Sequence, residues 1–254
     1  MNNFSHHWPY PFWIAHRGAG KLAPENTLAA FRLGAQFGYR MFECDVKLSS
    51  DDVIFLLHDA QLERTTNGQG TAGDLTWSEL ARLDAGQWHS RAFTGEPLPT
   101  LEALAKFCMA GGYFLNIEIK PTPGLERRTG EVVAAQVRQL WSKEAIPPLL
   151  TSFEPLALEA AYKVAPELPR GLLLNSWQKD AVSLAQTLQC QAMVCYYDIW
   201  NEERVGAVHQ AGFKALSYTV NDSKAALHLL QLATDGIITD RVDLFNEATF
   251  PLQQ

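Results

Sequence analysis

The stretch ALSYTVNDSKAALHLLQLATDGIIT, residues 215–239, contains the two patterns that decide the fold. Its ends, Ala215–Val220 and Gly236–Thr239, are short apolar runs of the length typical of buried strands. Between them, Ser223–Leu232 has apolar residues at helical spacing. A strand, a helix and a second strand in this order predict a right-handed βαβ unit, in which the two strands lie parallel.

The same alternation recurs through the whole chain. Further strands are predicted at Phe12–Ala15, Met41–Val46, Val53–Leu57, Tyr113–Ile119, Leu149–Phe153, Gly171–Leu174 and Ala192–Tyr196. Further helices are predicted at Thr27–Phe37, Leu101–Met109, Glu126–Trp141, Pro155–Tyr162, Asp180–Leu188, Glu202–Gln210 and Asp243–Glu247. About eight strand and helix units in a chain of 254 residues favour an α/β fold, a closed TIM (β/α)8 barrel, over an open doubly wound sheet.

One long segment interrupts this alternation. The chain between Asp45 and Glu118 is more than twice as long as the ~30 residues that one barrel unit takes. The surplus falls at about residues 59–99 and includes the turn-rich Thr65–Gly70. We therefore expect a single domain, residues 1–254, with a small inserted lobe after the second barrel strand and over the C-terminal mouth of the barrel.

The composition excludes several classes of protein. The chain has 28 acidic and 21 basic residues, a net charge of −7, which gives no support for a nucleic-acid or anionic-membrane partner. A hydrophobic content of 47% excludes disorder. The four cysteines lack framework spacing, and Met1–Pro11 has neither Lys nor Arg and no apolar run of signal-peptide length. We expect a cytoplasmic protein, a monomer or homodimer, with no stable membrane association.

Three carboxylates lie at strand ends that a barrel brings together. Glu43 and Asp45 are two residues apart, so strand periodicity places them on one face, and Glu118 ends another predicted strand. Active sites of parallel barrels lie at this carboxyl-terminal rim. Three converging carboxylates would repel one another unless a cation lay between them. Oxygen ligands alone select a hard ion, so we expect one divalent cation, Mg²⁺ or Ca²⁺.

Two histidines and two cationic residues lie at the same rim. His16 and His58 have side chains that titrate near neutral pH, which suits proton transfer. Arg17 and Lys120 carry fixed positive charge, which together with the metal would bind a phosphate. These groups together outline the site of a phosphoester hydrolase.

Several of these residues also have structural interpretations. Lys120 could only neutralise Glu118, and Arg17 could be a carboxylate partner. Glu25 lies in a helix-start pattern with Asn26 or Thr27 as the cap, which leaves a structural role and an active-site role for Glu25 equally open. Asp59 is not included in the site, because strand alternation would point it away from the neighbouring His58. Six aromatic residues are interpreted mostly as core or rim packing, with pocket lining as the alternative: Trp88, Phe93, Trp177, Tyr196, Tyr197 and Trp200.

An ordered series of motifs resembles the glycerophosphodiester phosphodiesterase family. The motifs are His16-Arg17-Gly18, Pro24-Glu25-Asn26-Thr27, Glu43-Cys44-Asp45-Val46, His58-Asp59, Arg64-Thr65-Thr66-Asn67-Gly68, Leu83-Asp84-Ala85-Gly86, Pro99-Thr100-Leu101, Asn116-Ile117-Glu118-Ile119-Lys120, Ser152-Phe153, Tyr218-Thr219-Val220-Asn221 and Asp235-Gly236-Ile237-Ile238-Thr239-Asp240. They span nearly the whole chain. Because Met1–Pro11 does not resemble a leader, we expect the chain to be similar to the cytoplasmic bacterial subgroup of this family.

The resemblance implies hydrolysis of small glycerophosphodiesters to sn-glycerol 3-phosphate and an alcohol such as choline or ethanolamine. It implies that His16 and His58 are the general acid and base. It further implies that a divalent metal is bound by three carboxylates and the phosphate by two cations: Glu43, Asp45 and Glu118 for the metal, Arg17 and Lys120 for the phosphate. Tyr218 stands where family members often carry Trp, which puts the fine shape of the pocket in doubt.

Two rival functions remain at this stage. A lysophospholipase D would use the same chemistry on a lipid-tailed substrate and would need an apolar patch at the rim. A non-catalytic barrel would have lost histidines or carboxylates of the site, and none is lost here. The chemistry itself also has two routes, attack by the neighbouring glycerol hydroxyl to give a cyclic phosphate, or direct attack by water.

Overall fold

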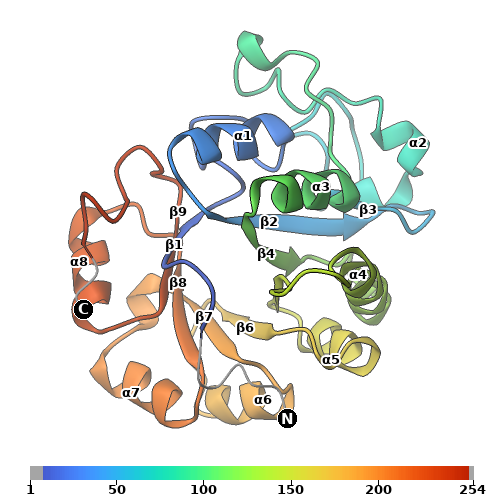
Figure 1. Cartoon of the computed structure of the whole chain (residues 1–254). Helices are drawn as coiled ribbons and strands as arrows, with labels where there is room; N and C mark the ends of the chain where they lie inside the picture. Colours follow the sequence, from blue (N-terminus) through green and yellow to red (C-terminus); the bar gives the residue numbers. More distant parts are fainter. Residues whose placement is uncertain (1–7, 252–254) are drawn as a thin grey trace.

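The strands form a closed parallel barrel, as predicted. The computed structural model describes residues 8–251. Within them, eight parallel strands follow one another in the order β1-β9-β8-β7-β6-β5-β4-β2, and β1 pairs with β2 to close the ring (Figure 1). The barrel strands are β1 (Trp13–Ala15), β2 (Met41–Leu48), β4 (Phe114–Ile119), β5 (Leu149–Ser152), β6 (Arg170–Leu174), β7 (Ala192–Tyr196), β8 (Lys214–Tyr218) and β9 (Gly236–Thr239).

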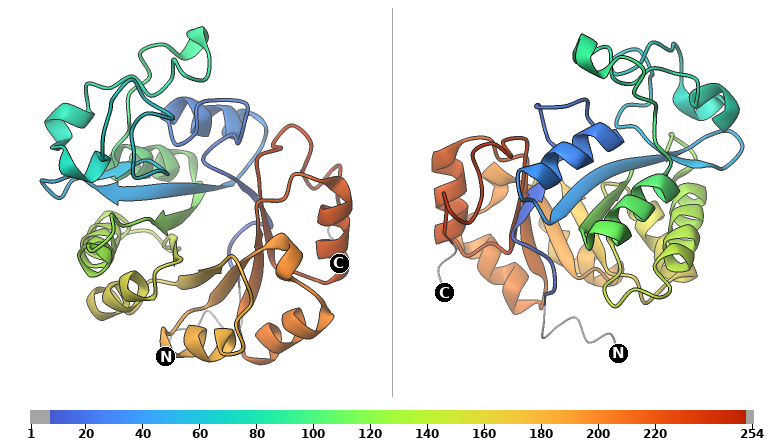
Figure 2. Two further views of the ribbon diagram at one scale, coloured as in Figure 1. Left: turned by 180° about the vertical axis from the view of Figure 1, so that it is seen from behind. Right: turned by 45° about the horizontal axis from the view of Figure 1, so that its top comes forward.

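Helices surround the strands on the outside, as two further views show (Figure 2). They are α1 (Leu28–Gln36), α3 (Leu101–Gly111), α4 (Glu126–Leu140), α5 (Pro155–Val164), α6 (Ala181–Thr187), α7 (Glu202–Gln210) and α8 (Ser223–Gln231). Thr27, Thr100, Asn201 and Asp222 each accept a backbone hydrogen bond at the start of a helix, which satisfies an amide that the helix leaves unpaired.

The core has two layers that alternate along each strand. Trp13 and Phe42 belong to a large apolar cluster packed against the helices. Ile14 and Met41, their neighbours in sequence, belong to a smaller cluster, and strand alternation directs them to the barrel axis. Glu43 and Asp45 continue the inward series that begins at Met41. The hydrophobic layer inside the barrel therefore gives way to carboxylates toward its carboxyl-terminal end.

The register of the strands brings the ends of β1, β2, β4 and β9 to one level. Asp45 pairs with Glu118 across β2 and β4. Ala15 pairs with Phe42 on one side and with Thr239 on the other. The next residue, His16, therefore lies at the level of Glu43 and Asp240. One rim thus collects residues that are far apart in the sequence.

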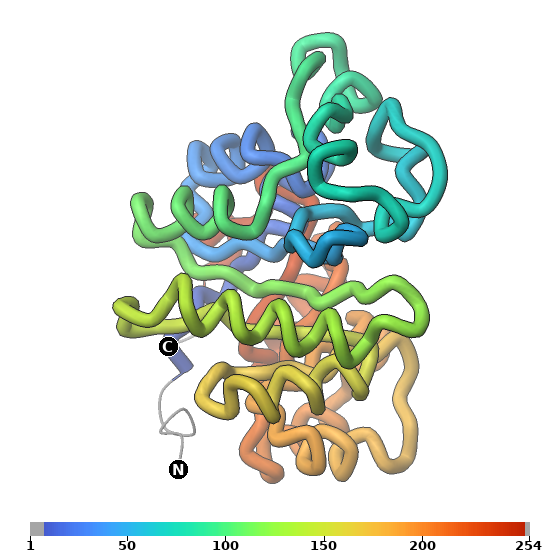
Figure 3. Tube along the Cα trace, turned by 90° about the vertical axis from the view of Figure 1, so that its right-hand side faces the viewer, coloured from blue at the N-terminus to red at the C-terminus, as the bar shows by residue number. Residues whose placement is uncertain are grey.

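A segment outside the barrel follows β2. The short strand β3 (Ile54–Leu56) pairs antiparallel with the end of β2, so it is a hairpin partner and not a barrel strand. Residues 59–99, the lobe, project beyond it and contain α2 (Trp77–Leu80) and two short 3-10 helices (Figure 1, Figure 3). The lobe and β3 share a small apolar cluster of their own: Phe55, Leu57, Leu62, Ala72, Leu80, Ala85 and Leu98.

The helix predicted at Asp243–Glu247 is wrong, because this segment forms consecutive turns. The side chain of Asn246 accepts hydrogen bonds from the amides of Ala248 and Thr249, at 3.0 and 2.9 Å, and so competes with helical pairing. Phe245 is fully buried, with its ring stacked on Trp13 at 5.6 Å between centroids. The ring of Phe245 thus anchors this segment in the apolar cluster between the strands and the helices.

Candidate active site

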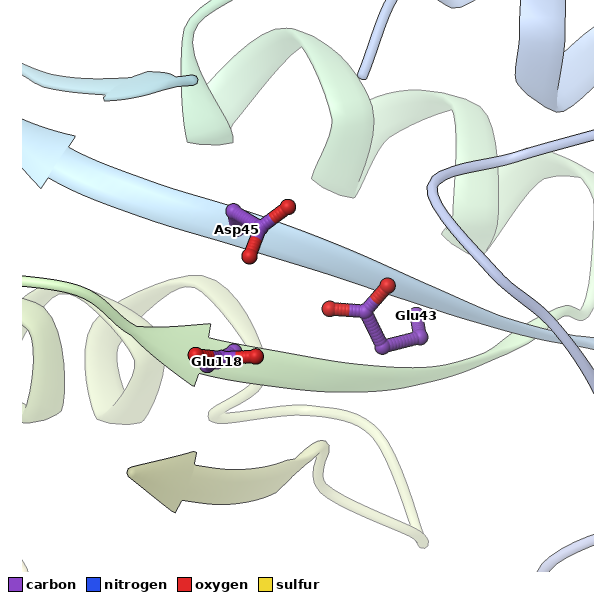
Figure 4. A group of neighbouring side chains, drawn as sticks. All are labelled: Glu43, Asp45 and Glu118. Atoms are coloured by element: carbon purple, nitrogen blue, oxygen red, sulfur yellow. The ribbon is translucent and has the colours of Figure 1, made fainter. Parts of the chain in front are cut away.

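Three carboxylates meet at the carboxyl-terminal rim, as the sequence predicts. One oxygen from each of Glu43, Asp45 and Glu118 lies within 4.8 Å of the others. Figure 4 shows Glu43 and Asp45 on β2 and Glu118 on the neighbouring β4, with their carboxylates gathered in one place. Glu43 and Asp45 are only 2% and 1% exposed. The barrel thus holds three acidic groups close together, two of them out of contact with water.

This crowding changes the proton affinity of the carboxylates. Burial, followed by the charges of Asp45 and Glu118, raises the pKa of Glu43 well above its usual value. Burial and the charge of Asp45 raise the pKa of Glu118 to about 7. Burial also raises the pKa of Asp45, but Arg17, His58 and Lys120 outweigh it and hold this pKa at about 2. The cluster therefore shares fewer than three negative charges at neutral pH.

Two oxygens of this cluster have no partner within the described residues. Oε1 of Glu43 and Oδ1 of Asp45 are buried and accept no hydrogen bond. A buried carboxylate oxygen without a partner is unfavourable unless a ligand satisfies it. An all-oxygen set with free acceptors fits a hard divalent cation, and so the residues present suit the metal that the sequence predicts.

His16 is held from behind by a carboxylate. Its Nδ1 lies 2.6 Å from Oδ1 of Asp240, and the other Asp240 oxygen accepts a hydrogen bond from Asn221. This contact favours a proton on Nδ1 and leaves Nε2 as the free ring atom. Nε2 lies 3.8 Å from Glu43, on the side of the carboxylate cluster.

His58 is held in the same way. Its Nδ1 lies 2.6 Å from Oδ1 of Asp59, whose other oxygen accepts a hydrogen bond from Arg64. The prediction that Asp59 points away from His58 is wrong, because both residues follow the end of β3 and strand alternation does not apply to them. Burial lowers the pKa of His58, which keeps its imidazole neutral and able to accept a proton.

Arg17 and Lys120, the two cations at the rim, both contact carboxylates, which is the alternative role that the sequence left open for them. Arg17 donates to Glu25 at 2.8 Å and lies 3.2 Å from Asp45. Lys120 donates to Glu118 at 2.9 Å. Glu25 also accepts two hydrogen bonds from Arg64 of the lobe, so its side chain links the barrel rim to the lobe. Both cations still line the cavity described next.

A cavity of about 170 Å³ lies over the carboxylates. Six of the seven predicted site residues line it: His16, Arg17, Glu43, His58, Glu118 and Lys120. Asp45, the seventh, is buried beside them as part of the carboxylate cluster. Phe153 and Tyr218 form an aromatic wall, with ring centroids 5.7 Å apart. The structure therefore gathers all seven predicted residues around one small polar space.

Two residues of the site were not predicted from the sequence. Asp240 follows β9 as His16 follows β1, so the rule that selected the other strand ends could have found it. Asn26 is a different case. It is buried with a φ of 58°, donates to Asp45 at 2.8 Å and accepts from the Asp45 amide at 3.1 Å. Its pattern suggested a helix cap, but Thr27 is the cap.

The family follows from a comparison with known sequences. A family model described as "Glycerophosphoryl diester phosphodiesterase family" matches residues 16–244, nearly all of the chain. The chain belongs to this family. It is therefore an enzyme of the phosphodiesterase class, as the motifs predict, and the rival interpretation as a non-catalytic barrel is not supported.

Individual relatives agree with the family over most of their length. A glycerophosphodiester phosphodiesterase of Caldanaerobacter subterraneus subsp. tengcongensis is 32% identical over 231 residues, 89% of this chain and 93% of the relative. One of Bacillus subtilis is 28% identical over 250 residues, 92% of this chain and 85% of the relative.

Solved structures share the barrel. An Oleispira antarctica phosphodiesterase in complex with the product sn-glycerol-3-phosphate has a TM-score of 0.86 and 32% identity, and the match covers 94% of this chain and 96% of that one. A glycerophosphodiester phosphodiesterase of Agrobacterium tumefaciens has a TM-score of 0.77 and 30% identity, and the match covers 92% and 98% of the two chains.

Among the described residues, no helix is long and apolar enough to cross a bilayer.

Proposed function

We propose that the enzyme hydrolyses small glycerophosphodiesters, such as glycerophosphocholine or glycerophosphoethanolamine, to sn-glycerol 3-phosphate and the free alcohol. One divalent cation, Mg²⁺ or Ca²⁺, would bind at Glu43, Asp45 and Glu118, and His16 and His58 would transfer protons. The observation that carries this proposal is the arrangement of two carboxylate-held imidazoles, two cations and three carboxylates around one cavity of about 170 Å³.

The metal would bind where the buried carboxylate oxygens lack partners, Oε1 of Glu43 and Oδ1 of Asp45. When bound, it supplies Lewis-acid chemistry, which stabilises negative charge on a phosphoryl oxygen. Asn26 holds Asp45 by two hydrogen bonds, at its side chain and at its amide, and so fixes the orientation of one ligand.

The imidazoles would act through Nε2, because Nδ1 of each is engaged by a carboxylate. Asp240 and Asp59 fix the tautomer and stabilise the imidazolium that forms when a ring accepts a proton. One ring would accept a proton from the attacking oxygen, and the other would donate a proton to the leaving oxygen. The same pair serves attack by the neighbouring glycerol hydroxyl and attack by water.

Arg17 and Lys120 would hold the phosphate. Both line the cavity: Arg17 shares its donors between Glu25 and Asp45, and Lys120 contacts Glu118. A guanidinium and an ammonium at the edge of a partly dry cavity strengthen binding of an anionic diester.

The cavity supports a small substrate. A lysophospholipase D would need a path for a long acyl chain, whereas a volume of about 170 Å³, with His, Arg, Lys and carboxylate side chains beside the aromatic wall, suits a group of a few carbons. The comparisons also name glycerophosphodiester phosphodiesterases.

The substrate class is tested by measuring turnover of glycerophosphocholine, glycerophosphoethanolamine and lysophosphatidylcholine side by side, with Mg²⁺ or Ca²⁺ added. We expect release of sn-glycerol 3-phosphate from the two short diesters and slow or no turnover of the lysolipid. Faster cleavage of the long-chain lipid would overturn the assignment. Trapping of a cyclic glycerol phosphate by 31P NMR would distinguish hydroxyl attack from water attack.

A further inference from the structure

A second cavity, of about 300 Å³, begins on the other side of His16 and Arg17. These two residues line both cavities, whereas His58 and the carboxylates Glu43 and Glu118 line the first alone. Lys21 lies on the barrel wall of the second cavity, and the lobe forms the facing wall. The two cavities thus meet at His16 and Arg17.

We propose that this second cavity receives the leaving alcohol, and that Lys21 selects alcohols rich in hydroxyl oxygens over alcohols that carry a positive charge. The inference rests on the proposed function, because it assumes that a phosphodiester is cleaved at His16. It adds a second binding site and names the chemistry of its occupant, a polyol such as glycerol.

The shape of the substrate motivates the assignment. A phosphodiester has one phosphorus and two ester arms, so a site that holds the phosphate beside Arg17 must accommodate an arm on each side. The cavity of about 170 Å³ contains the carboxylates, Lys120 and His58, and suits the glycerol phosphate that is retained. The larger cavity, about 300 Å³, remains for the group that leaves. His16 borders both and lies where the bond breaks.

The charges in the second cavity favour an oxygen-rich occupant. Glu25 is engaged by Arg17 and Arg64, and Asp240 by His16 and Asn221, so the carboxylates of this cavity already have donors. Lys21 is different. It is exposed, and among the described residues its ammonium makes no hydrogen bond or ion pair, although its charge lowers the pKa of Asp240. Its three donors are free for the hydroxyl groups of an alcohol.

The lobe supplies a fixed apolar surface opposite Lys21. Trp88 is 40% exposed, yet its indole N–H donates to the carbonyl of Ala85 at 2.9 Å, which fixes the ring. His89 lies edge-on to this ring, and its Nε2 is 3.0 Å from the Lys21 carbonyl oxygen. The ring of Trp88 would cover the carbon skeleton of the alcohol while Lys21 binds its oxygens.

Choline, as a leaving alcohol that carries a positive charge, is the useful comparison with a polyol. A trimethylammonium group is attracted to the face of a Trp ring, but the ammonium of Lys21 lines the same cavity and repels it. A polyol meets no such repulsion. The identity of residue 21 should therefore change the ranking of substrates that differ only in the leaving arm.

The test compares kcat/KM for glycerophosphoglycerol and glycerophosphocholine, both followed by release of glycerol 3-phosphate. We expect the wild-type enzyme to prefer glycerophosphoglycerol, and Lys21→Glu to lower the ratio of the two values by about tenfold. The change should lie in KM more than in kcat, because Lys21 would bind the leaving arm equally in ground and transition states. Trp88→Ala should raise KM for both substrates.

Lys143→Glu is the matched control, since Lys143 is exposed at the opposite end of the barrel, between α4 and β5. It makes the same change in net charge and should leave the ratio as in the wild type. A ratio within about twofold of wild type in Lys21→Glu would overturn the inference while leaving the proposed function intact. Failure of the wild-type enzyme to cleave either diester would overturn both.

Discussion

The two imidazoles of the site share one design, a carboxylate behind Nδ1 and a free Nε2. We expect Asp240 and Asp59 to act by positioning the two rings. The imidazoles, cations and metal-site carboxylates were predicted from the sequence by one rule: ionisable residues at the carboxyl ends of strands meet at one rim. Asp59 and Asn26 escaped this rule because they lie in loops, where strand periodicity gives no direction for a side chain.

Asp240→Asn tests the positioning role. The amide removes the charge that stabilises the His16 imidazolium, so we expect kcat to fall by about 10²-fold, as it should in His16→Ala. Asp235→Asn is the matched control, because it breaks a similar contact with His209, 2.7 Å long, at the other end of β9. Normal kcat in Asp240→Asn would contradict the assigned role.

Glu118 makes metal binding depend on pH. Its pKa in the metal-free protein is raised to about 7 by burial and by Asp45, and a bound cation favours the ionised form. The pKa of Glu43 is also raised, so protons must leave as the metal binds, and metal affinity should rise as pH increases through 7. Glu118→Gln should weaken binding by about tenfold or more and flatten this dependence. Calorimetry in two buffers of different ionisation enthalpy measures the released proton, and binding without release would contradict the account.

At the scale of elements, the sequence predicts most strands and helices to within one or two residues. The strong signals are apolar runs and helical spacing, which depend on local residues alone. Val53–Leu57 forms a strand as predicted, β3, and pairs antiparallel with the end of β2. Asp243–Glu247 fails as a helix because Asn246 binds the amides that follow it and because Phe245 packs in the core beside Trp13.

Helix α1 packs closely against the loop after β1, and adding one methyl group at Gly34 tests this contact. A Cβ on Gly34 would lie 2.1 Å from the carbonyl oxygen of Gly18, directly after the His16-Arg17 pair. We expect Gly34→Ala to lower the free energy of unfolding by about 1–3 kcal/mol through overpacking, measured by urea denaturation, and to lower activity as well.

Gly206→Ala in α7 is the control for that experiment. Its added Cβ would meet no atom within 4 Å, so the helix propensity of Ala should stabilise the protein by about 0.5–1 kcal/mol. Equal effects of the two substitutions would show that the close approach between α1 and the Gly18 carbonyl does not constrain the rim.

At the scale of the whole molecule, the chain is acidic although the proposed substrate is an anion, and the barrel separates the charges that explain this. The net charge of −7 includes the three carboxylates of the proposed metal site, while Arg17 and Lys120 place positive charge at the cavity. The closed barrel and the family follow from the strand alternation and the ordered motifs. The division into one domain with an inserted lobe stays a prediction, because it depends on how the lobe and barrel unfold together.

The central claim is that a divalent cation at Glu43, Asp45 and Glu118 is required for hydrolysis of glycerophosphodiesters. The most direct measurement follows release of sn-glycerol 3-phosphate from glycerophosphoethanolamine by enzyme stripped with EDTA, dialysed exhaustively and titrated with Mg²⁺ or Ca²⁺. The account predicts turnover close to background without metal and a saturable rise as one equivalent binds. Full activity in EDTA after exhaustive dialysis would contradict it.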